Sequence, residues 1–160
     1  MRRPLVIRNE DARRFQLGPD VWIVRAGAEE TAGRFDVLEA KVSRLQGPPL
    51  HMHAEQEDTF LVLSGTLKLQ VGEELIDLHP GDLASAPPAV PHTYTNVEDE
   101  PAHVCQHHDA RRPGSRVRGL REAATRTAAT GAAARAPEHH CIEVVGPPIA
   151  VRLGLVGEDS

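Results

Sequence analysis

Three histidines and one aspartate carry side chains that could together bind a metal ion. His51 and His53 are two positions apart, Asp58 follows them closely, and His92 lies further along the chain. On a β-strand, residues i and i+2 point to the same face, so the paired imidazoles can serve one ion. A helix would need i and i+4 spacing, and the two prolines just upstream argue against a helix. Taken alone, a His-x-His pair is more often surface-exposed or hydrogen-bonded than metal-binding.

The chemistry of this set is that of an open metal site. Three nitrogens and one carboxylate leave one or two positions free on a five- or six-coordinate ion, as catalysis requires. Imidazole and carboxylate suit Fe, Mn, Ni, Co, Cu and Zn as divalent ions, and the affinity order does not choose among them. The pattern therefore predicts one divalent metal ion of unspecified identity that a small-molecule substrate can reach.

Asp58 is the best candidate for the carboxylate ligand. Strand alternation puts Asp58 in phase with the apolar Phe60 and Val62, which are expected to face inward. Glu57 has the opposite parity, and Glu55 is the other nearby substitute. We therefore expect Asp58, rather than either glutamate, to face the ion.

Two stretches around these residues carry turn glycines and prolines in a set order. They are GPPLHMHAEQEDTFLVLSG at residues 47–65 and GDLASAPPAVPHTYTN at residues 81–96. Together they resemble the two motifs of the cupin superfamily, in which a His-x-His, a carboxylate and a later histidine converge inside a small antiparallel barrel. The residues that match the motifs are His51, His53, Asp58, Gly65, Gly81, Pro87, His92 and Asn96.

The sequence departs from the cupin pattern at three positions. Ala89 replaces a usual glycine, and Gly47 lies closer to His51 than the usual opening glycine, which affects turn geometry. Asp58 replaces the usual glutamate and is one methylene shorter. Its carboxylate therefore reaches the ion only if the backbone approaches by roughly 1.5 Å more, about one carbon–carbon bond. This substitution predicts weaker ligation by the carboxylate.

Segments outside the two motifs extend the likeness to the monocupins of the quercetin-dioxygenase-like group. They are residues 4–20, 30–42 and 142–148. The resemblance implies a metal-dependent, dioxygenase-type oxidoreductase that acts on a small enol- or hydroxyl-bearing organic molecule, with Asp58 as the catalytic base. The related thiol dioxygenases use three histidines without the carboxylate, so they match this chain less well.

Two other functions remain open at this stage. The first is a metal-dependent isomerase or lyase that works through an enediolate, which needs the same ion and no oxygen. Oxygen consumption would separate it from a dioxygenase. The second is a non-catalytic metabolite-binding cupin, which a weakly ligating Asp58 would favour. Metal content addresses that alternative.

Phe60, Val62 and Tyr94 are the candidate substrate-binding residues. Phe60 and Val62 share the parity of Asp58, and Tyr94 shares that of His92. A plain core role competes with this reading, because apolar and aromatic strand residues usually pack. The chain has only one Trp, one Tyr and three Phe. So few aromatic side chains favour a smaller or more aliphatic substrate over a large planar one.

Three further histidines, His103, His107 and His108, lie on the last predicted barrel strand. One of them could face the metal cavity as a proton shuttle. Because His107 and His108 are adjacent, they point to opposite faces, and at most one of the two can do so. The remaining histidines, at positions 79, 139 and 140, are predicted to be at the surface.

Turn signals arrive every eight to twelve residues, which is typical of an all-β sandwich or barrel. Strands are expected at residues 4–8, 21–25, 34–45, 66–71, 75–78, 83–86 and 102–108. We therefore predict an all-β cupin barrel of the jelly-roll type, with a core at about 34–109. An Ala- and Arg-rich stretch predicts one C-terminal α-helix at about 117–135, followed by a strand-like or extended tail at 141–153.

Length, charge and residue composition limit the kinds of binding partner that are expected for this protein. The 160 residues suit a single cupin domain over 1–160, and the formal net charge of −5 gives no general attraction to nucleic acid or anionic membrane. The seven arginines between Arg111 and Arg135 are interpreted as a solvated helix face, because no aromatic residues are interleaved with them.

The sequence lacks a secretory signal, a transmembrane run and a disulfide framework, so we expect a cytoplasmic protein. A homodimer is expected, since small barrels tend to cover an apolar outer sheet face with a partner.

Overall fold

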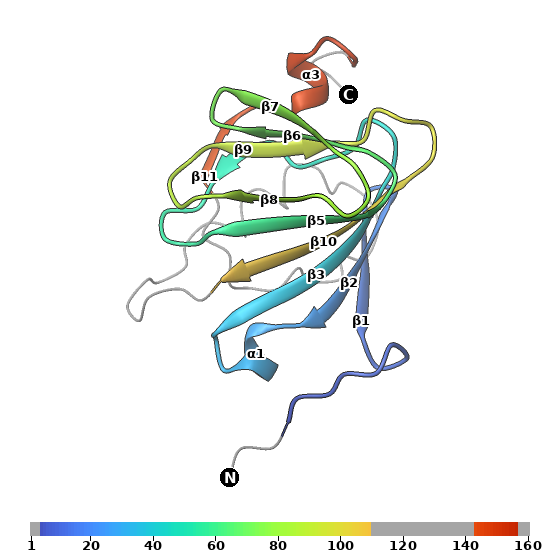
Figure 1. Cartoon of the computed structure of the whole chain (residues 1–160), viewed down its shortest axis with the longest axis vertical. Helices are drawn as coiled ribbons and strands as arrows, with labels where there is room; N and C mark the ends of the chain where they lie inside the picture. Colours follow the sequence, from blue (N-terminus) through green and yellow to red (C-terminus); the bar gives the residue numbers. More distant parts are fainter. Residues whose placement is uncertain (1–3, 110–142, 157–160) are drawn as a thin grey trace.

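The computed structural model of the chain describes residues 4–109 and 143–156. Two antiparallel sheets face each other across the molecule (Figure 1). The six-stranded sheet has the order β1 (Arg13–Leu17), β2 (Asp20–Ala26), β3 (Phe35–Val42), β10 (Ala102–Asp109), β5 (Asp58–Ser64) and β8 (Leu83–Ala86). The five-stranded sheet has the order β11 (Glu143–Gly146), β4 (Leu50–Met52), β9 (His92–Thr95), β6 (Leu67–Val71) and β7 (Glu74–Leu78). The predicted all-β, jelly-roll-type barrel is confirmed.

Successive strands of the barrel pass from one sheet to the other. β4 lies in the five-stranded sheet, β5 in the six-stranded sheet, the β6–β7 hairpin in the five-stranded sheet and β8 in the six-stranded sheet, and β9 and β10 repeat the alternation. The strand ends that carry the two motifs therefore meet at one end of the barrel. His51 of β4 is the register partner of His92 of β9, and Asp58 of β5 is the partner of His108 of β10.

The core lies between the sheets and follows the two-residue period of the strands. On β5, Phe60 and Val62 are each only 1% exposed, and Asp58 shares their face at 3%. The alternation predicted for these three residues is thus confirmed. The apolar cluster joins side chains from both sheets and includes Val42, Phe60, Val62, Val104, Leu67, Leu69 and Tyr94. Burial of this apolar surface provides the main driving force that holds the two sheets together.

The entry strands differ from the prediction at one place. Residues 4–8 form no strand, and Leu5 and Val6 are 46% and 63% exposed. The first strand is instead β1, which pairs with β2 across the predicted Gly18-Pro19 turn, where Gly18 has a φ of 58°. The prediction of a strand at residues 4–8 is therefore wrong. A short apolar run needs a neighbouring strand to satisfy its backbone hydrogen bonds, and the tight hairpin supplies that neighbour to β1 instead.

Two short helices were not predicted. α1 (Ala28–Thr31) follows β2, and α3 (Ile149–Arg152) follows β11. The C-terminal tail is thus a strand, as predicted, and then a helical turn rather than an extended segment. The helix predicted at 117–135 lies outside the described residues. None of the helices in the described ranges has the length and apolar character needed to cross a bilayer.

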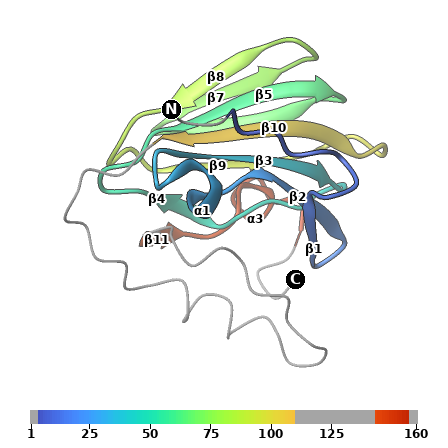
Figure 2. The same ribbon diagram turned by 90° about the horizontal axis from the view of Figure 1, so that it is seen from below.

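The C-terminal segment supports the strands that carry two of the candidate ligands. Figure 2 shows β11 running beside β4, where Val144 is the register partner of His51. α3 packs against β9, with Ile149 only 1% exposed. β4 and β9 themselves pair through a single residue pair, His51 and His92. The short strand β4 therefore takes most of its backbone pairing from β11.

Candidate metal centre

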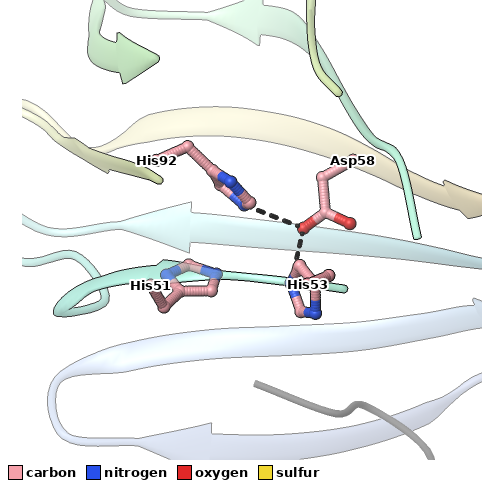
Figure 3. Close-up of side chains that lie close together, drawn as sticks. All are labelled: His51, His53, Asp58 and His92. Atoms are coloured by element: carbon pink, nitrogen blue, oxygen red, sulfur yellow. Dashed lines mark hydrogen bonds and ion pairs between the residues drawn. The ribbon is translucent and has the colours of Figure 1, made fainter. Parts of the chain in front are cut away.

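The structure brings the four predicted ligands together. One donor atom from each of four residues lies within 4.8 Å of the other three, and the residues are His51, His53, Asp58 and His92. In Figure 3 the histidine rings and the carboxylate converge from β4, the turn after β4, β5 and β9. All four residues are buried, with exposed fractions of 7% or less. The arrangement is compact enough for one ion to bind all four.

Backbone carbonyls orient two of the imidazoles. Nδ1 of His51 lies 2.8 Å from the carbonyl oxygen of Pro49, and Nδ1 of His92 lies 3.0 Å from that of Val90. A carbonyl oxygen only accepts, so each Nδ1 carries the proton and donates it. In the neutral ring, each Nε2 is therefore left with a lone pair. Fixing the tautomer through the other ring nitrogen is the usual way in which a protein prepares a histidine ligand.

The carboxylate of Asp58 faces two of the imidazoles through a single oxygen. Oδ2 lies 3.1 Å from Nε2 of His53 and 3.3 Å from Nε2 of His92. Because Nδ1 of His92 already donates, a hydrogen bond from its Nε2 to Asp58 needs a doubly protonated ring. A cation removes that need, since the lone pairs and the carboxylate charge can all point at it. The donor set therefore fits a divalent metal ion.

Burial and the neighbouring histidines shift the acidity of the ligands in the direction that metal binding needs. Burial, followed by the nearby His92, lowers the pKa of His51 to about 4. Burial opposes ionisation of Asp58, but the adjacent imidazoles of His53 and His92 outweigh it and hold the pKa of that carboxyl well below its usual range. Near neutral pH, His51 is thus neutral and Asp58 is ionised, as ligands must be.

The metal-free protein is expected to lose stability as the pH falls from 6.5 to about 4. The folded chain protonates His51 near pH 4 and the unfolded chain near 6.5, so the unfolded state binds more protons in this window. At about 1.4 kcal/mol per pH unit, the free energy of unfolding falls by up to roughly 3 kcal/mol. The lowered pKa of Asp58 acts in the same direction at still lower pH.

Urea denaturation of the metal-free protein at about pH 7.5 and about pH 4.5 measures this loss through the linkage between protons and folding. The matched variant is His51→Gln, which keeps a polar side chain but removes the titrating ring. Its stability should fall less between the two pH values. An equal fall in both proteins would assign the pH dependence to other groups.

Of the three histidines predicted on the last strand, His108 is the one that faces the cluster. Nε2 of His108 lies 3.6 Å from Oδ2 of Asp58, and its ring centroid lies 6.4 Å from that of His53. His107 is exposed and packs on Phe35, and His103 bonds to a carboxylate on the outer face of the sheet. The expectation that at most one of His107 and His108 faces inward is confirmed. His79 is exposed, as predicted, and His139 and His140 lie outside the described residues.

The three candidate substrate-binding residues all lie in the apolar core. Phe60, Val62 and Tyr94 are 1%, 1% and 3% exposed. The ring of Phe60 lies edge-on to His92 at 6.1 Å and also meets Tyr94 at 5.7 Å. The Tyr94 hydroxyl accepts a hydrogen bond of 2.7 Å from the side-chain amide of Gln106. Phe60 therefore borders the cluster, whereas the contacts of Tyr94 are those of a packed core residue.

Gln56 is a site residue that the sequence reasoning missed. Its side-chain amide donates to Oδ1 of Asp58 at 2.9 Å, and the residue is only 4% exposed. The signal that could have found it is parity, because Gln56 lies two residues before Asp58 and shares its inward phase. Its position in the turn before β5, outside any predicted strand, hid that phase.

The turn that precedes His92 contains a strained alanine. Ala89 has a φ of 61°, and its N–H donates to the carbonyl oxygen of His53 at 2.7 Å. An L-residue in this left-handed conformation costs about 1–2 kcal/mol, which glycine avoids. We therefore expect Ala89→Gly to raise the free energy of unfolding by about 1 kcal/mol after the greater freedom of glycine in the unfolded chain is counted.

Chemical denaturation of the wild-type and Ala89→Gly proteins tests this expectation. Metal affinity should change little, because the hydrogen bond to His53 uses only the backbone. A loss of stability on substitution would show that the alanine methyl makes contacts that outweigh the backbone strain.

A cavity of about 180 Å³ lies away from the cluster. It is open to the surface and lies between the N-terminal segment, β1, β2 and α1, and its lining residues are Val6, Ile7, Asp11, Arg13, Val24, Ala26 and Glu30. None of the four clustered side chains contributes to this cavity.

Comparison with known proteins agrees with this geometry. The cupin domain family matches residues 42–107, which include all four clustered residues. Quercetin 2,3-dioxygenase of Bacillus subtilis (strain 168) is 31% identical over 91 residues, which cover 57% of this chain. The matched part spans only 27% of the length of that relative.

Solved structures share the architecture at low sequence identity. KdgF from Halomonas sp. aligns with a TM-score of 0.59 and 19% identity, covering 69% of this chain and 97% of that protein. A predicted oxalate decarboxylase from Thermotoga maritima aligns with a TM-score of 0.59 and 13% identity, covering 66% of this chain and 99% of that protein. At these identities the likeness shows the fold alone. The sequence motifs, the barrel and the family match therefore agree, and residues 42–107 of this chain match a cupin domain.

Proposed function

We propose that this chain is a metal-dependent oxidoreductase of the dioxygenase type, acting on a small enol- or hydroxyl-bearing organic molecule. The observation that carries the proposal is the convergence of three imidazoles and one carboxylate within 4.8 Å inside the barrel. The partial similarity to quercetin 2,3-dioxygenase supports the type of reaction. Open coordination positions, which this donor set leaves, are what a catalytic site needs.

The residues have distinct roles in this proposal. His51, His53 and His92 hold the ion through ring nitrogens. A bound divalent ion would stabilise negative charge on a substrate oxygen and so favour the deprotonated enol or hydroxyl. Asp58 supplies the fourth ligand, and its Oδ2 can accept the substrate proton if that oxygen comes within hydrogen-bond reach. The lowered pKa of Asp58 keeps this acceptor ionised near neutral pH.

The burial of the site favours a small substrate. His92 is 1% exposed, and His53 and Asp58 are 3% exposed. Phe60, whose ring lies edge-on to His92, packs against Tyr94 in the core. Such packing leaves little aromatic surface to hold a large planar ring system, as the scarcity of aromatic residues also indicated.

The test combines metal analysis with oxygen measurement. Protein purified without added metal is analysed for its metal content, then loaded in turn with Fe(II), Mn(II), Ni(II), Co(II), Cu(II) and Zn(II). Each form is incubated with a panel of small enols, α-hydroxy ketones and catechols while dissolved oxygen and product are followed. Oxygen consumption that depends on the metal, the substrate and His92 supports the proposal. Conversion without oxygen uptake would instead identify an isomerase or lyase.

A second candidate is favoured by the same burial. A cluster whose residues are all 7% exposed or less could belong to a non-catalytic metabolite-binding cupin. This candidate predicts that members of the same panel raise the melting temperature of the metal-loaded protein but are recovered unchanged. The proposed enzyme should convert at least one of them, so product analysis of the stabilising compounds separates the two functions.

A further inference from the structure

The two oxygens of the Asp58 carboxylate have different surroundings. Oδ2 faces the imidazoles of His53 and His92 at 3.1 Å and 3.3 Å. Oδ1 accepts the hydrogen bond from the side-chain amide of Gln56 at 2.9 Å. His108 also approaches Oδ2, at 3.6 Å, rather than Oδ1. The carboxylate is therefore oriented, with one oxygen directed at the cluster and the other held by a neutral donor.

The donor itself is well fixed. Gln56 is 4% exposed and occupies the turn that leads into β5. The next residue, Glu57, is tied to the end of β10, because its N–H donates to the Asp109 carboxylate at 2.9 Å and its carbonyl accepts from the Asp109 N–H at 3.2 Å. The Glu57 carboxylate also accepts a hydrogen bond from Ser85 of β8. The turn that presents the Gln56 amide is thus held on two sides.

This arrangement limits the rotation of the Asp58 carboxylate. A carboxylate that rotates freely can present either oxygen, or both, to an ion, and it loses that freedom on binding. A hydrogen bond to Oδ1 already restricts the rotation of the carboxylate before the ion binds, so less rotational freedom is lost on binding. It also leaves Oδ2 as the single ligand atom. Groups that orient a ligand in this way typically contribute about 10–100-fold to metal affinity.

We propose that Gln56 is a positioning residue for the metal site, which holds Oδ1 of Asp58 so that only Oδ2 faces the ion. The inference rests on the proposed metal site and adds to it the residue that fixes the orientation of the carboxylate ligand. Gln56 acts through Asp58 and makes no contact with the ion itself. Its effect should therefore be seen only when Asp58 is present.

The experiment is a double-mutant cycle on metal affinity. The dissociation constants for Mn(II) and Zn(II) are measured by competition with a chelator for the wild type, Gln56→Leu, Asp58→Ala and the double variant. Gln56→Leu should weaken binding by about 10–100-fold in the wild-type background. In the Asp58→Ala background the same substitution should change binding by less than about twofold, because the group through which Gln56 acts is gone.

Two further variants keep the result interpretable. Gln70→Leu is the matched control, because Gln70 is also a buried glutamine, 4% exposed, whose amide donates to the carbonyl of Gly72 rather than to the cluster. Its metal affinity should equal that of the wild type. Gln56→Glu keeps the side-chain volume if the leucine variant does not fold. It replaces the donor with an acceptor, so it should weaken binding at neutral pH at least as much.

The outcomes separate this inference from the proposed function. Unchanged affinity in Gln56→Leu, together with a clear loss in Asp58→Ala, would overturn the positioning role and leave the metal site standing. An equal loss in both backgrounds would show that Gln56 acts by another route and would also overturn the role. If the wild type binds none of the six divalent ions named above, the metal site itself fails, and the positioning role fails with it.

Discussion

His92→Ala is expected to abolish stoichiometric metal binding. Nδ1 of His92 donates to the carbonyl of Val90, which points Nε2 toward the cluster, and its ring centroid lies 4.4 Å from that of His51. Alanine removes a ligand and leaves a space of ring size among buried neighbours. The loss of affinity should exceed the roughly 100-fold that removal of an outer-sphere partner can cost. Elemental analysis and chelator competition measure the change.

The control for His92→Ala is another histidine of the same barrel. His79 is exposed in the turn between β7 and β8, and the hydrogen bonds that it makes there with Asp82 use its backbone N–H and carbonyl rather than its ring. His79→Ala should bind metal like the wild type. Circular dichroism must show that both variants are folded. Full metal occupancy in a folded His92→Ala protein would remove this residue from the ligand set and with it the proposed site.

Gly47→Ala is expected to be the most destabilising of the small substitutions. A Cβ at position 47 would lie 1.8 Å from the carbonyl oxygen of Tyr94 and 2.9 Å from its carbonyl carbon. These are backbone atoms of β9, so no side-chain rotation can relieve the contact. The chain segment ahead of His51 must move away from β9. The cost should reach or exceed the upper end of the roughly 1–3 kcal/mol that overpacking usually causes.

Urea denaturation of Gly47→Ala gives the loss of stability, and Gly81→Ala provides the comparison. Gly81 has a φ of 93°, and a Cβ added there would meet nothing within 4 Å. Its substitution therefore reports backbone strain alone, about 1–2 kcal/mol. Metal affinity should also fall in Gly47→Ala, because the displaced segment carries His51. A loss no larger than that of Gly81→Ala would show that the backbone at position 47 can move away from β9 at little cost.

Two features of the sequence identified the four clustered residues: a local rule for His51, His53 and Asp58, and the resemblance to the second cupin motif for His92. Strand alternation places residues two apart on one face whatever the rest of the molecule does. That rule joined His51 to His53 and chose Asp58 over Glu57. Each choice agrees with the observed burial of the side chains. The turn glycines and prolines then indicated how often the chain reverses, and hence a barrel of short strands.

Sequence reasoning failed where a choice depended on a partner far along the chain. The apolar residues 4–8 have strand composition, but β1 forms at Arg13–Leu17, because only that segment lies across a tight turn from β2. Alternation left His107 and His108 equivalent. The pairing of β10 with β5 decided between them by setting His108 opposite Asp58.

What the sequence alone determined about this protein is which side chains share a face and which segments turn. Only the tertiary structure decided how close those faces come. The 4.8 Å cluster, the tautomers set by the carbonyls of Pro49 and Val90, and the bond from Gln56 to Oδ1 of Asp58 all depend on how the two sheets pack. The physical reason is the separation along the chain over which each effect acts. Alternation acts over two residues, whereas these contacts bring together atoms from strands that pair through tertiary structure.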